Sequence, residues 1–110
     1  MIIRRYDNTK ASEAHSGTIR AHEVLPKDGE FSVPFNSAWG YIASEGALEK
    51  HSHPADEIYI IFKGKGLVCV GEEYAEVNCG DIIEIPANQP HNIKNMTSSE
   101  LLWLAFWWKK

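Results

Sequence analysis

The stretch His51-Ser52-His53-Pro54-Ala55-Asp56-Glu57, followed after a further 33 residues by His91, decides the fold of this chain. Three imidazoles and one carboxylate together make a set of metal ligands. His51 and His53 lie two positions apart, and side chains at that spacing point in the same direction on a β-strand but in opposed directions on a helix. The two histidines can therefore bind one ion only if residues 47–53 are extended.

The residues after the two histidines predict a turn and then a second strand. Pro54 has a fixed φ and ends the first strand, and Asp56 is a residue type that turns favour. Glu57 then begins a strand over residues 57–62, which are rich in β-branched and aromatic side chains. We therefore expect two neighbouring strands to share one ion.

The rest of the chain divides into short runs of β-forming residues separated by turn residues. The segment 7–17 predicts a loop with one helical turn at most. The last run, 101–108, is almost entirely apolar, but its short length and aromatic content favour a strand over a buried helix. The remaining predicted strands cover residues 1–6, 18–25, 31–35, 38–43, 67–70, 74–77, 82–85 and 91–93. This succession of short strands is typical of an all-β sandwich or barrel.

Length and charge limit the classes of protein to consider. A chain of 110 residues predicts one domain, 1–110, with one modest core. The net charge of −4 and the absence of clustered Lys and Arg argue against binding to nucleic acid. No apolar run approaches the roughly 20 residues of a membrane-spanning helix, and the N-terminus lacks a signal peptide, so we expect a soluble cytoplasmic protein with no membrane partner.

Two glycine-bounded motifs make the pattern specific. The first consists of Gly46, four residues, His51-Ser52-His53, three residues, Glu57, six residues and Gly64. The second consists of Gly80, five residues, Pro86-Ala87-Asn88, two residues, His91, three residues and Asn95. Together the two motifs span residues 46–95, nearly half of the chain.

In these two motifs the chain resembles the cupins, and in its short spacer it is similar to their small single-domain members. The first motif departs from the family pattern by one missing residue in its first gap. In the second motif Asn88 stands where glycine is usual, and this departure is mild because asparagine tolerates left-handed backbone conformations.

The resemblance implies a double-stranded β-helix, or jelly-roll barrel, with a metal ion held inside it. The ligands carry over to His51, His53, Glu57 and His91, the same four residues that the spacing picks out. The resemblance also implies a homodimer, because small cupins pack or exchange N-terminal strands. Residues 1–6 and the apolar run 101–108 are the candidate segments for that contact.

The ligand types predict which ion the site binds. Imidazole nitrogens select a divalent transition metal, namely iron, manganese, nickel, cobalt, copper or zinc, over magnesium and calcium. Four protein ligands leave one or two coordination positions open, and the site carries a net charge of +1. We therefore expect a small molecule with an anionic or enolisable oxygen to bind at the ion.

Alternation along the predicted strand 57–62 places Tyr59 on the same face as Glu57, inside the barrel. Tyr59 is therefore a candidate for hydrogen bonding to a bound molecule or for acid–base catalysis, and the alternative is a core aromatic. No other catalytic residue is assigned.

Three further aromatic residues, Trp39, Tyr41 and Trp103, are candidates for substrate binding, with core or dimer packing as the alternative. His22 either points at the cavity or has a structural role. His15 lies in the polar loop and is given no role.

Three functions are compatible with this site. The first is a metal-dependent enzyme, a dioxygenase, isomerase or lyase, that acts on a small carboxylate, diketone or sugar derivative. The second is a module that binds or senses a small molecule without reacting it. The third is a purely structural ion that holds the strands together. A fold of this kind carries many reactions, so the class of reaction stays open at this point.

Overall fold

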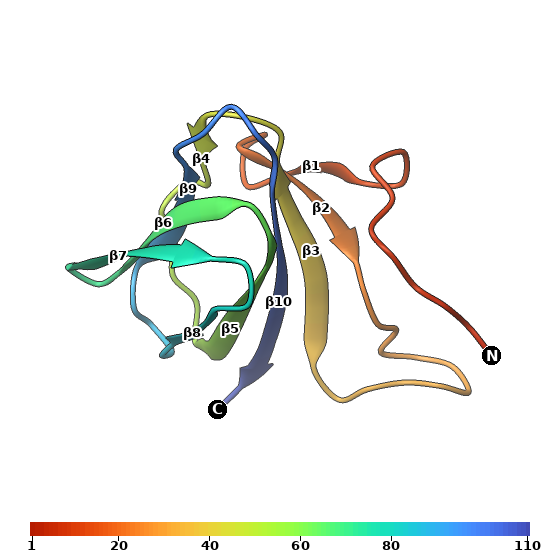
Figure 1. Cartoon of the computed structure of the whole chain (residues 1–110). Coiled ribbons are helices and arrows are strands. Elements are labelled where there is room, and N and C mark those ends of the chain that lie inside the picture. Colours follow the sequence, from red (N-terminus) through yellow and green to blue (C-terminus); the bar gives the residue numbers. More distant parts are fainter.

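A computed structural model describes all 110 residues, and every regular element in it is a β-strand (Figure 1). The chain contains no helix long and apolar enough to span a membrane. The strands are β1 (Ser12–Ala14), β2 (Ile19–Glu23), β3 (Asn36–Ile42), β4 (Gly46–Ala47), β5 (Ala55–Lys63), β6 (Lys65–Val70), β7 (Glu73–Asn78), β8 (Ile82–Ile85), β9 (His91–Asn95) and β10 (Leu101–Lys109).

The strands form two antiparallel sheets. The larger sheet has the order β1-β2-β3-β10-β5-β8, and the smaller has the order β4-β9-β6-β7. β10 lies inside the larger sheet, where it pairs with β3 on one side and β5 on the other, and Figure 1 shows it running between them. The predicted all-β jelly-roll barrel is confirmed, and the apolar C-terminal run is a strand.

β5 shows the alternation that a half-buried strand requires. Glu57, Tyr59 and Ile61 are 6%, 2% and 1% exposed and point into the barrel. Phe62, on the opposite face, is 55% exposed. The predicted inward orientation of Tyr59 is thus confirmed, and it follows from the period of two along a strand.

The core is one cluster of buried side chains from both sheets, with the Trp103 indole among its largest members. This indole packs directly against Gly40 on the neighbouring strand β3. A Cβ at position 40 would lie 2.2 Å from the ring, so only glycine leaves room for the indole there. The cluster consists of Ile19, Ile42, Leu48, Tyr59, Ile61, Val68, Val77, Ile85, Ile93, Leu101, Trp103 and Ala105.

Two predicted strands are wrong. Residues 1–6 form no strand, although Ile2 and Ile3 have high β propensity, because β1 already occupies that edge of the larger sheet. Residues 31–35 also form no strand; they belong to the loop between β2 and β3, and Pro34 has no N–H to donate to a ladder. The hairpin of β1 with β2 was not predicted, since the polar segment 7–17 shows no alternation.

The segment that carries the two histidines is extended but is only partly a strand. β4 ends at Ala47, and His51 rejoins the sheet through an isolated bridge to His91. The predicted turn at Asp56 is wrong, because Asp56 already lies in β5. Its carboxylate instead accepts a hydrogen bond of 2.8 Å from the backbone N–H of Ala87, which ties β5 to the loop before His91.

Asn88 has a φ of +69°, so it adopts the left-handed conformation. This confirms that asparagine takes over the backbone role of the usual glycine at this place in the second motif. Its N–H donates to the backbone carbonyl of His53 at 2.8 Å, so this loop contacts the segment that carries the metal ligands.

Asn95, the last residue of the second motif, is fully buried and holds a turn in place. Its side-chain N–H groups donate to the carbonyls of Ile42 and Ser99 at 3.1 and 2.8 Å. Its side-chain oxygen accepts from the N–H and the hydroxyl of Thr97 at 3.0 and 3.1 Å. The residue is therefore a structural part of the motif rather than part of the metal site.

Replacing Asn95 with alanine is expected to lower the free energy of unfolding by about 2–4 kcal/mol, because two carbonyls and one backbone N–H lose their partners in a buried place. The exposed Asn78 on β7 provides the control, and Asn78→Ala is expected to change stability by about 0.5 kcal/mol or less. Urea unfolding measures both; equal midpoints for the two variants would contradict the structural role of Asn95.

Candidate metal centre

The four predicted ligands come from separate parts of the chain, and the fold brings them together. His51 and His53 lie in the segment before β5, Glu57 lies in β5, and His91 is the first residue of β9. Their potential ligating atoms all lie within 4.8 Å of one another. The spacing of these atoms is that of a single-ion site, with two ligands from the segment before β5, one from β5 and one from β9.

Backbone hydrogen bonds fix the direction of two of the imidazoles. The Nδ1 of His51 lies 2.9 Å from the carbonyl of Glu49, and the Nδ1 of His91 lies 2.8 Å from the carbonyl of Gln89. A carbonyl only accepts, so in both rings Nδ1 carries the proton and Nε2 keeps its lone pair. Both rings are thus in the tautomer that binds a metal through Nε2.

The polar atoms at the centre of the cluster are not satisfied by the protein alone. Glu57 Oε1 lies 3.0 Å from the Nε2 of His53, with which it hydrogen-bonds. It also lies 3.1 Å from the Nε2 of His91, but that pair lacks hydrogen-bond geometry, and the buried His91 Nε2 has no hydrogen-bond partner. A cation coordinated by this nitrogen would satisfy it, so the donor set fits a divalent transition metal.

The His51 imidazole is in the charge state that metal binding requires. The pKa of His51 is lowered, chiefly because burial disfavours the charged imidazolium. His51 is therefore neutral at neutral pH, which is the form that coordinates a metal.

A cavity of about 340 Å³ adjoins the cluster. Tyr59 and Trp103, two of the predicted substrate-binding residues, line it, with their rings 5.8 Å apart. Burial and the nearby Glu57 carboxylate raise the pKa of Tyr59 well above its ordinary value, so Tyr59 stays protonated at neutral pH. Its hydroxyl can donate a hydrogen bond but does not act as a base. The complete lining is Ala14, His15, Ile19, Ala21, Ala38, Trp39, Gly40, Leu48, His51, His53, Glu57, Tyr59, Trp103, Ala105 and Trp107.

The structure places Tyr41 away from this cavity, because odd-numbered residues of β3 face outward. The Tyr41 ring stacks on Tyr6 at 5.2 Å, and its hydroxyl donates to Glu100 at 2.8 Å. Trp39 borders the cavity, but its ring packs against Tyr6 and Phe62 on the outer face, at 6.0 and 5.3 Å. Tyr41 was therefore wrongly predicted to line the cavity.

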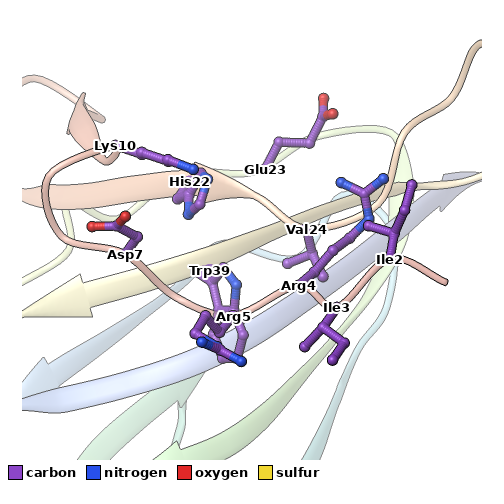
Figure 2. Close-up of a pocket in the computed structure, with 10 residues that line it drawn as sticks. All are labelled: Ile2, Ile3, Arg4, Arg5, Asp7, Lys10, His22, Glu23, Val24 and Trp39. Atoms are coloured by element: carbon purple, nitrogen blue, oxygen red, sulfur yellow. The ribbon is translucent and has the colours of Figure 1, made fainter.

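His22 also lies on the outer face. Together with Trp39 it lines a separate pocket of about 470 Å³ between the N-terminal segment and strands β2 and β3 (Figure 2). Arg4 and Arg5 of the N-terminal segment also line this pocket (Figure 2). His22 therefore takes no part in the metal cluster.

Two residues of the cavity were missed. His15 lies at its mouth, and its ring is 4.3 Å from that of His51. No signal in the sequence identifies it, because the hairpin of β1 and β2 that carries it was not predicted. Trp107 faces inward beside Glu57, its partner across the strands, and the alternation Trp103, Ala105, Trp107 could have found it.

The two-sheet barrel with a His₃Glu cluster defines the class of protein. A model of the cupin domain family matches residues 39–107, more than half of the chain. The chain therefore belongs to the cupin domain family.

Solved structures of other proteins have the same fold. A Cupin 2 conserved barrel domain protein from Salinispora arenicola superposes with a TM-score of 0.86 at 24% identity over 99% of this chain and 89% of that one. A Photorhabdus luminescens protein has a TM-score of 0.85 at 28% identity over 100% of this chain and 89% of that one.

Sequence relatives match over shorter stretches. An uncharacterized protein of Methanocaldococcus jannaschii is 42% identical over 55 residues, covering 50% of this chain and 43% of that protein. Acireductone dioxygenase 1 of Pectobacterium atrosepticum is 37% identical over 51 residues, covering 43% of this chain and 30% of that enzyme. The chain spans less than half the length of these relatives.

Adding one equivalent of Ni²⁺ or Zn²⁺ to metal-free protein is expected to raise the melting temperature, because an ion that binds only the folded state stabilises it by about 2.7 kcal/mol at 100 times its Kd. Mg²⁺ at the same concentration is expected to have little effect, since it disfavours nitrogen ligands. Differential scanning fluorimetry measures both shifts.

The matched variants are His91→Ala, which removes a ligand, and His22→Ala, which removes a histidine of the outer face. The nickel-induced shift should disappear in the first and persist in the second. A shift that survives in His91→Ala would show that the ion binds elsewhere.

Proposed function

We propose that this protein is a metal-dependent enzyme in which His51, His53, Glu57 and His91 hold one divalent transition ion that binds a small oxygen-bearing molecule. The observation that carries the proposal is the unpartnered Nε2 of His91. This buried nitrogen lies among three other potential ligands and beside a cavity large enough for a small molecule.

Each residue of the site has a defined task. The carbonyls of Glu49 and Gln89 orient the His51 and His91 rings, and the Glu57 carboxylate offsets part of the positive charge. A divalent transition ion supplies Lewis-acid polarisation of an oxygen ligand or lowers the pKa of a bound water. Tyr59 supplies a hydrogen-bond donor inside the cavity.

The sequence relatives favour oxygen chemistry among the three reaction classes considered. Acireductone dioxygenases of three bacteria match this chain at 37–39% identity. Each match covers 43% of this chain and 30% or less of the enzyme, so it supports a dioxygenase by similarity of one segment.

A second candidate function is binding of a small molecule without reaction. The composition of the cavity favours it, because only Tyr59 and His15 add polar side chains to those of the ligands. With Tyr59 protonated at neutral pH, the cavity wall offers few groups that could move a proton. The two functions differ in whether the bound molecule is recovered unchanged.

Turnover separates the two candidates. Protein loaded with Fe²⁺ or Ni²⁺ is incubated with 2-oxo acids, 1,3-diketones and enediols, while oxygen uptake is recorded and products are identified by mass spectrometry. We expect conversion by the loaded wild-type protein and a loss of about 100-fold or more in His51→Ala, because a ligand is missing.

His22→Ala is the matched control and should retain the wild-type rate, since His22 lies on the outer face. If a molecule binds tightly but is recovered unchanged after long incubation, the binding function replaces the enzymatic one. Conversion that persists in His51→Ala or without metal would end the proposal of metal-dependent catalysis.

We also propose that two copies of this chain associate through the outer face of the larger sheet. The outward residues of β10 and those of β5 from Ile58 to Phe62 are apolar, and Ile82 of β8 pairs with Ile60 beside them. Phe62, Ile82 and Trp108 are 55%, 63% and 38% exposed. Cross-strand pairs such as Ile58 with Phe106 make this face continuous. Two such faces can pack on each other in a symmetric dimer.

Light scattering during gel filtration should give about twice the chain mass of 12.4 kDa for the wild-type protein. The double variant Phe62→Glu, Ile82→Glu should elute as a single chain, because a charge buried in an apolar interface disfavours association. Tyr74→Glu, an exposed aromatic of β7 in the other sheet, is the control and should leave the dimer intact. A double variant that remains dimeric would exclude this face as the interface.

A further inference from the structure

The cavity beside the metal ligands is bounded on one side by the inner face of the larger sheet. The part of the cavity that lies against this face is called the hollow below. Four small residues there are neighbours across the strands: Ala21 pairs with Gly40, and Ala38 pairs with Ala105. All four line the metal-side cavity. Side chains of this size leave the depth of the cavity free, whereas larger side chains at these inward positions would fill it.

The hollow ends at polar groups that the protein does not satisfy. Tyr59 pairs with Ala105 across β5 and β10, is 2% exposed, and lines the cavity. Its hydroxyl makes no hydrogen bond to any other residue of the chain, so a bound molecule can accept its proton. The buried Nε2 of His91 is also unpartnered, and the two rings are 6.1 Å apart.

Polar side chains line only one part of this cavity. They are the ligands His51, His53 and Glu57, together with Tyr59 beside the cluster and His15 against His51. No Lys, Arg, Ser, Thr, Asn, Gln or Asp lines the cavity. The rest of the wall is alanine, glycine, aliphatic side chains and the rings of Trp39, Trp103 and Trp107.

We propose that the molecule bound here has a single chelating head with two adjacent oxygens and an apolar body that fills the hollow. This inference rests on the proposed metal site and narrows its substrate class to a 2-oxo acid or a diketone with a hydrocarbon-like remainder. The head takes the open positions of the ion and accepts a hydrogen bond from Tyr59. The body packs against Ala21, Ala38 and Ala105.

The same wall disfavours the sugar derivatives considered from the sequence. Each hydroxyl of a sugar that enters the hollow loses its hydrogen bonds to water, and the side chains of the wall there offer no acceptor for its proton. Such a loss costs roughly 1–3 kcal/mol per buried polar group. A molecule with polar groups at both ends therefore binds more weakly than an apolar one of equal length.

Alkyl hydroxamic acids test this inference, because they chelate a divalent ion through two adjacent oxygens and differ only in the length of the chain. Acetohydroxamic, butanohydroxamic and hexanohydroxamic acids are titrated into Zn²⁺-loaded protein by calorimetry. We expect the affinity to rise about fourfold per methylene, which corresponds to the usual gain for burying one such group. Adipic acid monohydroxamate, of matched length but with a terminal carboxylate, should bind at least about tenfold more weakly than hexanohydroxamic acid.

Two variants test whether the apolar body of the bound molecule lies in the hollow. Ala105→Leu and Ala38→Leu each fill it, and each should abolish the dependence on chain length while leaving acetohydroxamic acid bound. Ala75→Leu, at an exposed position on β7 outside this cavity, is the control and should keep the dependence. Circular dichroism establishes which of the two variants folds, and either one suffices.

The outcomes separate this inference from the proposed function. If the protein takes up no Zn²⁺ or fails to bind acetohydroxamic acid, the metal site itself is refuted. If both bind but the affinity does not increase with chain length, or the adipic compound binds equally well, the apolar body is refuted and the metal site stands. If Ala38→Leu and Ala105→Leu both fold and keep the chain-length dependence, the body binds outside the hollow.

Discussion

The reciprocal backbone bridge between His51 and His91 is the constraint on which the site depends. His51 N–H donates to the carbonyl of His91 at 3.1 Å, and His91 N–H donates to the carbonyl of His51 at 2.8 Å. In each residue the Nδ1 also donates to the carbonyl two positions earlier in the chain. The same local geometry thus occurs on both sides of the bridge, and it directs both Nε2 atoms to one point. The bridge links the two sequence motifs and orients their histidines at the same time.

The larger sheet serves two purposes because the side chains of its strands point alternately to its two faces. On β10 the inward residues Trp103, Ala105 and Trp107 belong to the cavity wall, while Leu104 and Phe106 face outward. Both faces are therefore apolar, which explains the nearly uninterrupted apolar run at the end of the chain. The N-terminal hairpin completes the wall, since it contributes Ala14 and Ala21 and places His15 against His51. The arrangement leaves the metal cluster facing a largely apolar space.

Much of the fold and of the ligand set could be predicted because both follow from local rules. The i, i+2 spacing of His51 and His53 requires extended backbone, and alternation along β5 places Glu57 and Tyr59 on one face. Asn88 adopts the predicted left-handed conformation. The strand predicted from β propensity at residues 1–6 is wrong, because β1 already occupies that edge of the sheet. The turn predicted at Asp56 is also wrong, because the Asp56 carboxylate accepts a hydrogen bond from the N–H of Ala87, a residue 31 positions away in the sequence.

The sequence by itself determined the strands, the inward face of β5, the family resemblance and the identity of the four candidate ligands, since each depends on residue type and short-range spacing. Only the tertiary structure decided what surrounds those ligands. It turned Tyr41 outward, brought His15 to the mouth of the cavity, and set Ala21, Ala38, Gly40 and Ala105 side by side. The physical reason is that pairing register between strands distant in sequence fixes which side chains share a surface, and no local pattern encodes that register.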